Sequence, residues 1–132
     1  MTLVYLVMLL ALLQFYLFGV AVGRARTTYG IAAPAVSGNA DFERIYRVHM
    51  NTLEQLVVMI PAMLVYAHYI NARWAAAFGL IYIIGRIVFY FGYRKAANKR
   101  SLGFTISALP VMILLAGAIF AVCRALLTSG TL

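Results

Sequence analysis

The chain alternates between four long apolar blocks and short polar connections. The apolar blocks cover roughly residues 2–22, 53–70, 74–92 and 102–127. At a helical rise of ~1.5 Å per residue, each block is about long enough to cross the ~30 Å hydrocarbon layer of a membrane. Only helices and closed barrels can span lipid, and runs of this length without strict alternation are typical of helices. The pattern predicts an all-α membrane protein, a four-transmembrane-helix bundle that forms one domain over residues 1–132.

Composition supports this prediction. Of the 132 residues, 65% are hydrophobic and 11% are charged, whereas the apolar share of a soluble domain is about 45–50%. The first block is expected to stay as a span rather than to act as a signal peptide. It has no basic leader before Leu3, it is longer than an ordinary signal-peptide core, and no clean small-residue cleavage site follows it. The single cysteine, Cys123, cannot form an intrachain disulfide.

The basic residues are distributed unevenly among the connections, and the net charge is +8. Those in or beside the first and third connections are Arg24, Arg26, Arg44, Arg47, Arg94, Lys95, Lys99 and Arg100. Lys and Arg favour the cytoplasmic side of a membrane, which predicts that these two connections are cytoplasmic and that both termini lie opposite. Bacterial inner membrane and endoplasmic reticulum both fit. No nucleic-acid partner is expected, because the basic residues flank spans and form no extended soluble surface.

The second span carries a phased set of polar residues near its start, which is expected close to Phe42. At about 100° per residue, Arg47, Asn51 and Glu54 fall within about 60° of one another, and His49 points the opposite way. Such groups are costly in lipid and are usually functional. A polar face on the second span is therefore predicted at its cytoplasmic end.

The third span is predicted to carry a matching polar face. Arg86, Tyr90, Tyr93 and Arg100 are separated by 4, 7 and 14 residues from the first of them, and on a continuous helix these offsets keep one face. Because this span runs back toward the side where the second span begins, the two faces are expected at the same depth. The two polar faces would then be opposed across the helix interface.

Two interpretations of this cluster are open. Glu54 could form an intramembrane ion pair with Arg86 or Arg47 that holds the bundle together. However, one acid faces at least three arginines, so the surplus is cationic and favours an anionic ligand. Arginine suits carboxylates because its planar fork donates two parallel hydrogen bonds and stays charged. A metal site is not expected, since His49 and His68 lie ~28 Å apart along one helix.

Together these features resemble the membrane-associated proteins in eicosanoid and glutathione metabolism, the MAPEG family. The resemblance covers essentially the whole chain and includes the four spans and the long first loop. The matching residues of the second span are Glu43, Arg44, Arg47, Asn51 and Glu54. Those of the third span and its end are Arg86, the pair Gly92-Tyr93, and Arg100, at the spacing of the microsomal glutathione transferases and the leukotriene-C-forming synthase.

The resemblance implies a homotrimer that binds glutathione in a cytoplasm-side pocket between neighbouring subunits. It implies that Arg47, Asn51, Glu54 and Tyr93 bind the tripeptide, and that the adjacent subunit supplies Arg26 and His49. Arg100 stands where an arginine stabilises the thiolate in glutathione-conjugating members. The predicted catalytic residue is therefore Arg100, and the predicted glutathione-binding residues are Arg26, Arg47, His49, Asn51, Glu54, Arg86, Tyr90 and Tyr93.

The chemistry of glutathione agrees with these residues. The tripeptide offers two carboxylates for the arginines, an ammonium for Glu54, and a thiol whose free pKa of about 8.5 leaves little thiolate at neutral pH. A cation beside the sulfur lowers that pKa. The expected function is a membrane-bound glutathione transferase, with glutathione as co-substrate and with a peroxidase activity left open. A lipophilic second substrate, an electrophile, would enter from the lipid bilayer.

Two other functions are kept as alternatives. The first is a non-catalytic, lipid-binding relative, against which Tyr93 and Arg100 argue. The second is a small multidrug exporter, which would need an acidic site for cations, whereas Glu54 is outnumbered by arginines. Gln55 and Phe89 depart from the pattern of some family members, so the resemblance does not separate eicosanoid synthesis from general detoxification.

Overall fold

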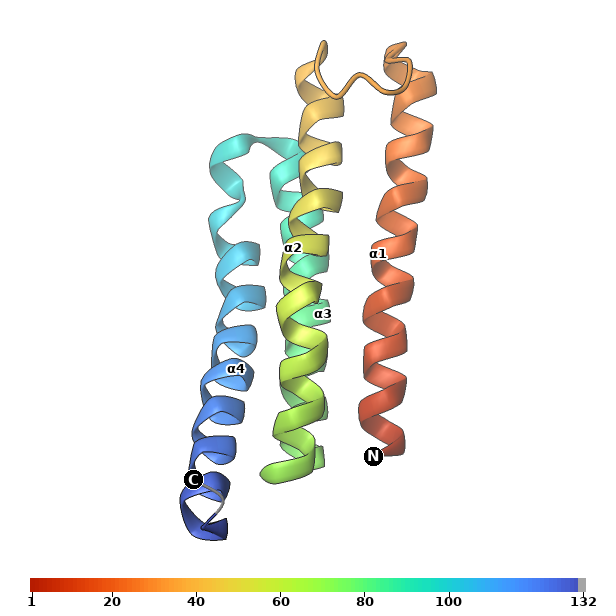
Figure 1. Cartoon of the computed structure of the whole chain (residues 1–132). Coiled ribbons are helices and arrows are strands. Elements are labelled where there is room, and N and C mark those ends of the chain that lie inside the picture. The colour runs from red at the N-terminus through yellow and green to blue at the C-terminus, as the bar shows by residue number, and fades with distance from the viewer. Residues whose placement is uncertain (131–132) are drawn as a thin grey trace.

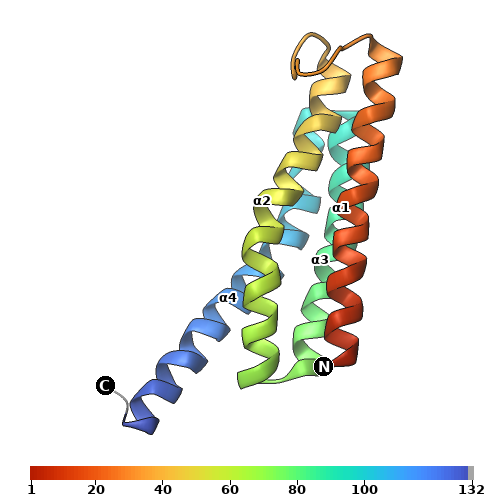
Figure 2. The ribbon, with the colours of Figure 1, turned by 45° about the vertical axis from the view of Figure 1, so that its right-hand side comes forward.

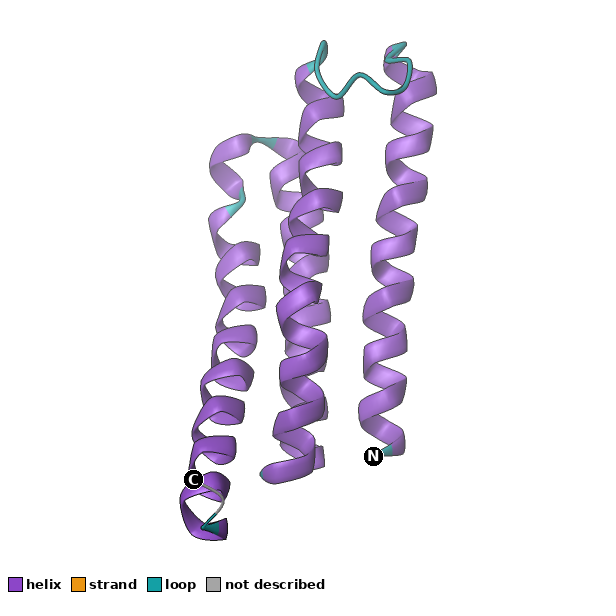
Figure 3. Ribbon diagram, in the orientation of Figure 1, coloured by secondary structure: helices purple, strands orange, loops and turns teal. Residues whose placement is uncertain are grey.

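Four long helices make up the protein in the computed structural model, which describes residues 1–130 (Figure 1). In chain order the elements are α1 (Thr2–Tyr29), α2 (Ala40–Tyr69), α3 (Ala72–Lys95), the 3₁₀ turn η1 (Ala97–Lys99) and α4 (Ser101–Ser129). Each of the four long helices is long and apolar enough to cross a membrane. The prediction of an all-helical, four-span integral membrane protein is therefore confirmed. The helices are joined by loops (Figure 3), and α2 begins at Ala40, well before the apolar block that predicted it.

Asparagine side chains fix where two of the helices begin. Asn39 accepts hydrogen bonds from the backbone N–H groups of Asp41 and Phe42 at 2.9 and 3.1 Å, and Asn71 caps α3 in the same way. Such caps satisfy N–H groups that have no partner within the helix. At the other boundary of the first loop, Gly30 ends α1 with φ of 68°, a left-handed conformation that glycine adopts at little cost.

The helices run alternately up and down, so the chain has two distinct ends. The end of α1, the start of α2, the end of α3 and the start of α4 lie together at the top of Figure 1. The N-terminus, the α2–α3 turn and the end of α4 lie at the opposite end, and Figure 2 shows α4 leaning away from the other helices there. The basic first and third connections therefore share one end of the bundle, as their charges predicted; we call it the basic end.

Close approach of α3 and α4 gives the basic end its shape. A Cβ placed on Gly103 would lie 2.2 Å from the backbone nitrogen of Phe89, and one on Gly85 would lie 2.5 Å from the backbone nitrogen of Ser107. These glycines let the two backbones touch, as small residues do between membrane helices. As a result, the start of α4 lies directly against the last turns of α3.

Candidate functional site

A polar cavity opens at the basic end between α2, α3 and the start of α4. Its volume is ≈ 490 Å³, within the range of small-molecule pockets. Four of the predicted site residues meet here: Arg47 and Asn51 from α2, Tyr93 from α3, and Arg100 immediately before α4. The complete lining, which we call the polar cavity, consists of Arg47, Asn51, Phe89, Tyr93, Arg100, Ser101, Phe104 and Thr105.

Glu54 is held against one wall of the polar cavity by two of these residues. Arg47 donates to both of its carboxylate oxygens, at 3.2 and 3.5 Å, and the Asn51 amide donates at 3.2 Å. The side chains of Arg47 and Glu54 are each 52% exposed. An exposed ion pair is worth only ~0–1 kcal/mol. An incoming carboxylate can therefore replace Glu54 on Arg47 at small cost and leave Glu54 available for a cation.

Arg86 lies behind this wall and is fully buried. Its guanidinium donates to the Thr52 hydroxyl at 2.8 and 3.1 Å, to Oδ1 of Asn51 at 3.0 Å and to the Ser107 hydroxyl at 3.3 Å. The ion pair suggested for Glu54 thus forms with Arg47 and not with Arg86, whose side-chain hydrogen bonds all go to neutral groups. Arg86 does not line the polar cavity itself, but it contacts two residues that do, Asn51 and Phe89.

Arg100 reaches the cavity by a different route from the one predicted. The prediction that it continues the face of the third span is wrong, because α3 ends at Lys95 and the chain then reverses through η1. The reversal packs on Gly92, where a Cβ would lie 2.6 Å from the carbonyl oxygen of Lys99. Folded back in this way, the guanidinium carbon of Arg100 lies 5.9 Å from the centroid of the Tyr93 ring.

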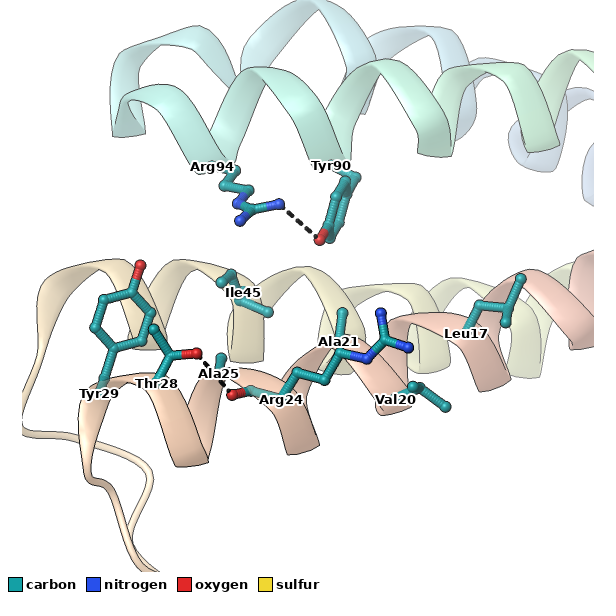
Figure 4. Close-up of a pocket in the computed structure, with 10 residues that line it drawn as sticks. All are labelled: Leu17, Val20, Ala21, Arg24, Ala25, Thr28, Tyr29, Ile45, Tyr90 and Arg94. Carbon is teal, nitrogen blue, oxygen red and sulfur yellow. Dashed lines mark hydrogen bonds between the residues drawn. The ribbon is translucent and has the colours of Figure 1, made fainter.

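Tyr90 does not share a cavity with Tyr93, so the prediction of one common face is also wrong for this residue. Its ring stacks on Phe18 of α1 with centroids 5.0 Å apart, and its hydroxyl accepts a hydrogen bond from Arg94 at 3.3 Å. Tyr90 lines a second cavity, between α1 and α3 (Figure 4). The two tyrosines are about 60° apart around α3, and Arg86 occupies the direction between them.

His49 and Arg26 lie on the α1 side of the bundle, away from the polar cavity. His49 stacks on Phe15 at 4.5 Å, which confirms that it points opposite to Arg47. Arg26 donates to the carbonyl oxygen of Ala35 at 2.7 Å and lies over the Phe42 ring. Within one chain, therefore, neither side chain lines the polar cavity.

Several residues of the site were not predicted. Ser101, Phe104 and Thr105 line the polar cavity from α4, a span whose sequence suggested packing only. Two hydroxyl residues one turn apart directly after Arg100 were the available signal. Thr52 and Ser107, which hold Arg86, gave no comparable signal. Among residues 1–130, no group of three or more His, Cys, Asp or Glu could hold a metal ion.

Known proteins resemble the chain over most of its length. A model of the MAPEG family matches residues 3–123. The uncharacterized protein sll1147 of Synechocystis is 42% identical over 89% of this chain and 85% of its own length. Microsomal glutathione S-transferase 2 of Mus musculus is 42% identical over 83% of this chain and 78% of its own. Leukotriene C4 synthase of Cavia porcellus is 33% identical over 80% and 69%.

Proposed function

The chain belongs to the MAPEG family, and on that premise we propose that it is a membrane-bound glutathione transferase. The conjunction of Arg47, Asn51, Tyr93 and Arg100 around one polar cavity carries the proposal. Relatives named as glutathione S-transferase and leukotriene C4 synthase support a transferase that uses glutathione. The uncharacterized Synechocystis relative adds nothing about the second substrate.

Binding begins with exchange of partners at Arg47. A glutathione carboxylate replaces Glu54 on the fork of Arg47, because the existing ion pair is exposed and weak. Glu54 then accepts the ammonium group of the tripeptide. Asn51 stays fixed because Arg86 donates a hydrogen bond to its amide oxygen. The amide N–H of Asn51 therefore faces Glu54. Anionic and cationic ends of the ligand are thus recognised on one wall.

Catalysis then depends on Arg100. A guanidinium beside the sulfur favours the thiolate over the thiol, and the proton passes to water. The thiolate attacks the electrophilic carbon of the second substrate, a carbon–sulfur bond forms, and the leaving group departs with its electron pair. Phe89 and Phe104 form an apolar part of the cavity wall against which a lipophilic substrate can pack. The Tyr93 ring lies beside Arg100 and lines the same cavity.

The assembly in this proposal is a homotrimer with its polar cavities on the cytoplasmic side. Closed symmetry is the rule for homo-oligomers, and a site between subunits uses opposite faces of one chain. Here Arg26 and His49 lie on the face opposite to Arg47. On that face, Arg26 and His49 could line the polar cavity of a neighbouring subunit. The excess of Lys and Arg at the basic end supports the cytoplasmic orientation.

Purified full-length protein in detergent provides the test. Titration calorimetry with glutathione is expected to show saturable binding, and addition of chlorodinitrobenzene is expected to yield the glutathione conjugate, detected by its absorbance. Glutathione binding without conjugate, for this and a lipophilic epoxide, would favour the non-catalytic relative. No heat with glutathione would remove the proposed function altogether.

A further inference from the structure

A second cavity at the basic end lies apart from the polar cavity, between α1 and α3. It has a volume of ≈ 390 Å³ and is open to the surroundings of the bundle. Figure 4 shows Arg24 reaching into it from α1, and Tyr90 and Arg94 from α3. Tyr90, which lines this cavity, stacks on Phe18 of α1. We call this second cavity the α1–α3 groove.

The charge of the α1–α3 groove is not neutralised by the protein. Its lining contains two arginines and no acidic residue. In the part of the chain that the structure describes, the Arg24 guanidinium has no hydrogen bond or ion pair, and Arg94 donates only to the Tyr90 hydroxyl, at 3.3 Å. Two guanidinium groups therefore face one gap from opposite helices, an arrangement that favours an anion with several acceptor oxygens.

The shape of the groove indicates what kind of anion it fits. Its wall on α1 toward the middle of the helix is apolar, with Leu17 55% and Val20 38% exposed. The 28 residues of α1 span ~42 Å, about 12 Å more than the hydrocarbon layer. Arg24, five residues before the end of α1, then lies at the depth of the lipid headgroups, with the apolar wall below it in the acyl region. The groove is polar and cationic where a headgroup lies and apolar where a chain lies.

We propose that the α1–α3 groove is a binding site for one anionic phospholipid. The phosphodiester lies between Arg24 and Arg94, and an acyl chain follows Leu17 and Val20 along α1. Basic pockets between membrane helices on the cytoplasmic side are typical sites for anionic headgroups. A diffuse basic surface would also attract anionic lipids, but it would not require Arg24 and Arg94 to line the same groove. Here the two side chains line one groove from different helices (Figure 4).

Native mass spectrometry of the delipidated full-length protein in detergent tests the site. Phosphatidylglycerol and phosphatidylcholine of matched chain length are titrated separately, and the dissociation constant of the first bound lipid is measured. Wild-type protein is expected to prefer phosphatidylglycerol. Arg24→Gln and Arg94→Gln should each weaken that preference about five-fold, and the double variant about 25-fold. Both side chains are exposed, so the variants should elute from size exclusion like the wild type.

Lys95→Gln is the matched control, since it removes the same charge from the same end of α3 but lies outside the groove. It should change the preference less than about two-fold. An equal effect of Lys95→Gln would overturn the proposal in favour of a diffuse basic surface. Displacement of phosphatidylglycerol by millimolar inorganic phosphate, with no effect of chain length on affinity, would indicate a site for free anions. A further variant carries Val20→Cys in a Cys123→Ala background. If its copies cross-link readily and the protein retains no lipid, a second copy of the chain covers the groove and the proposal is wrong.

Discussion

Arg86 shows how a buried charge can act on a ligand that it does not touch. Burying an ionised group is costly unless it is fully hydrogen-bonded. Arg86 meets this requirement with neutral oxygens from two neighbouring helices, and its guanidinium lies 4.2 Å from the centroid of the Phe89 ring. Because Arg86 donates to Oδ1 of Asn51, the amide nitrogen must face the other way, toward Glu54. We therefore interpret Arg86 as a positioning residue for the polar cavity.

Arg86→Lys tests this interpretation. Lysine keeps the charge but cannot donate to Thr52 and Asn51 together in a fixed fork. We expect a lower melting temperature in detergent and a Kd for glutathione raised about ten-fold, a loss of about 1.4 kcal/mol. Thr52→Val is the control, because it removes one acceptor of Arg86 and leaves the bond to Asn51 intact. It should lower the melting temperature with little change in Kd. Equal Kd changes in both variants would indicate a purely structural role.

Arg100 and Arg47 are expected to have separable effects. In the proposed mechanism the charge of Arg100 acts on the sulfur as the thiolate forms. Arg100→Ala should therefore leave the Kd for glutathione within a few-fold and reduce kcat by about 10²-fold or more. Arg47→Ala and Glu54→Ala remove contacts to the ligand termini and should raise Kd. Calorimetry and steady-state kinetics on the three variants distinguish these effects. If all three lose affinity equally, the division of roles is wrong.

At the scale of elements, the crossing of α3 over α4 holds the polar cavity together. A Cβ at position 103 would lie within 2.4 Å of the Phe89 backbone, so it cannot be accommodated without separating the helices. Gly103→Ala should lower the free energy of unfolding by about 1–3 kcal/mol through overpacking. It should also weaken glutathione binding, because Phe89 on α3 and Ser101 on α4 both line the cavity. Thermal unfolding in detergent and calorimetry provide the two measurements.

Gly23→Ala is the matched control for this prediction. Gly23 lies inside α1, and a Cβ there would meet nothing within 4 Å. Alanine should therefore be neutral or stabilise the protein by about 1 kcal/mol through its higher helix propensity. If Gly103→Ala behaved like Gly23→Ala in both measurements, close approach of α3 and α4 would not be what shapes the cavity.

Helical periodicity predicted one wall of the polar cavity correctly and misplaced the other. Arg47, Asn51 and Glu54 lie on one uninterrupted helix, so their angular spacing carries directly into the structure. The interval from Arg86 to Arg100 crosses the end of α3 at Lys95, so helical spacing cannot predict which way Arg100 points. That end depends on a tertiary contact, the Lys99 carbonyl against Gly92. Periodicity therefore placed Arg100 beside Tyr93 for the wrong reason, because it assumed one continuous helix, whereas the two residues meet through the chain reversal after Lys95.

Tertiary packing also explains why the surroundings of Arg86 could not be predicted. Thr52 and Ser107 are hydroxyl residues within membrane spans, and such residues commonly bond their own helix, as both do here to carbonyls one turn earlier. Their second role depends on α2, α3 and α4 meeting at one depth. The four spans themselves were predictable because their apolar length reflects the thickness of the membrane, independently of how the helices pack.

At the scale of the whole molecule, the two ends of the bundle differ in character. The polar cavity and the α1–α3 groove both lie at the basic end. Toward the other end, where α4 leans away (Figure 2), a groove of ≈ 580 Å³ between α2 and α4 is lined by apolar side chains and Cys123. Each of the two cavities at the basic end is lined by two arginines, whereas a cavity at the opposite end is lined by one, Arg124. At the basic end, Arg26 and Arg47 lie on opposite faces of one chain, so a site that used both side chains would have to form between two copies.

Mixing two inactive variants tests that association. If the site forms between subunits, Arg26→Ala and Arg100→Ala each disable every site of their own homotrimer. In a mixed assembly, a site is complete where the cavity belongs to an Arg26→Ala chain, which keeps Arg100, and the neighbour is an Arg100→Ala chain, which keeps Arg26. If the two variants are present in equal amounts and mix randomly, about one interface in four has this arrangement. Conjugation activity should then recover to about a quarter of the wild-type value.

The mass of the co-purified complex, measured by native mass spectrometry, should equal three chains and show mixed composition. Mixing after separate purification, without exchange of subunits, serves as the control and should restore no activity. If mixed trimers form and remain inactive, Arg26 acts within its own subunit, where it already bonds the Ala35 carbonyl. Recovery of activity would instead show that Arg26 of one subunit and the polar cavity of its neighbour form one site. The assembly would then require Arg26 and Arg47 to lie on opposite faces of each chain.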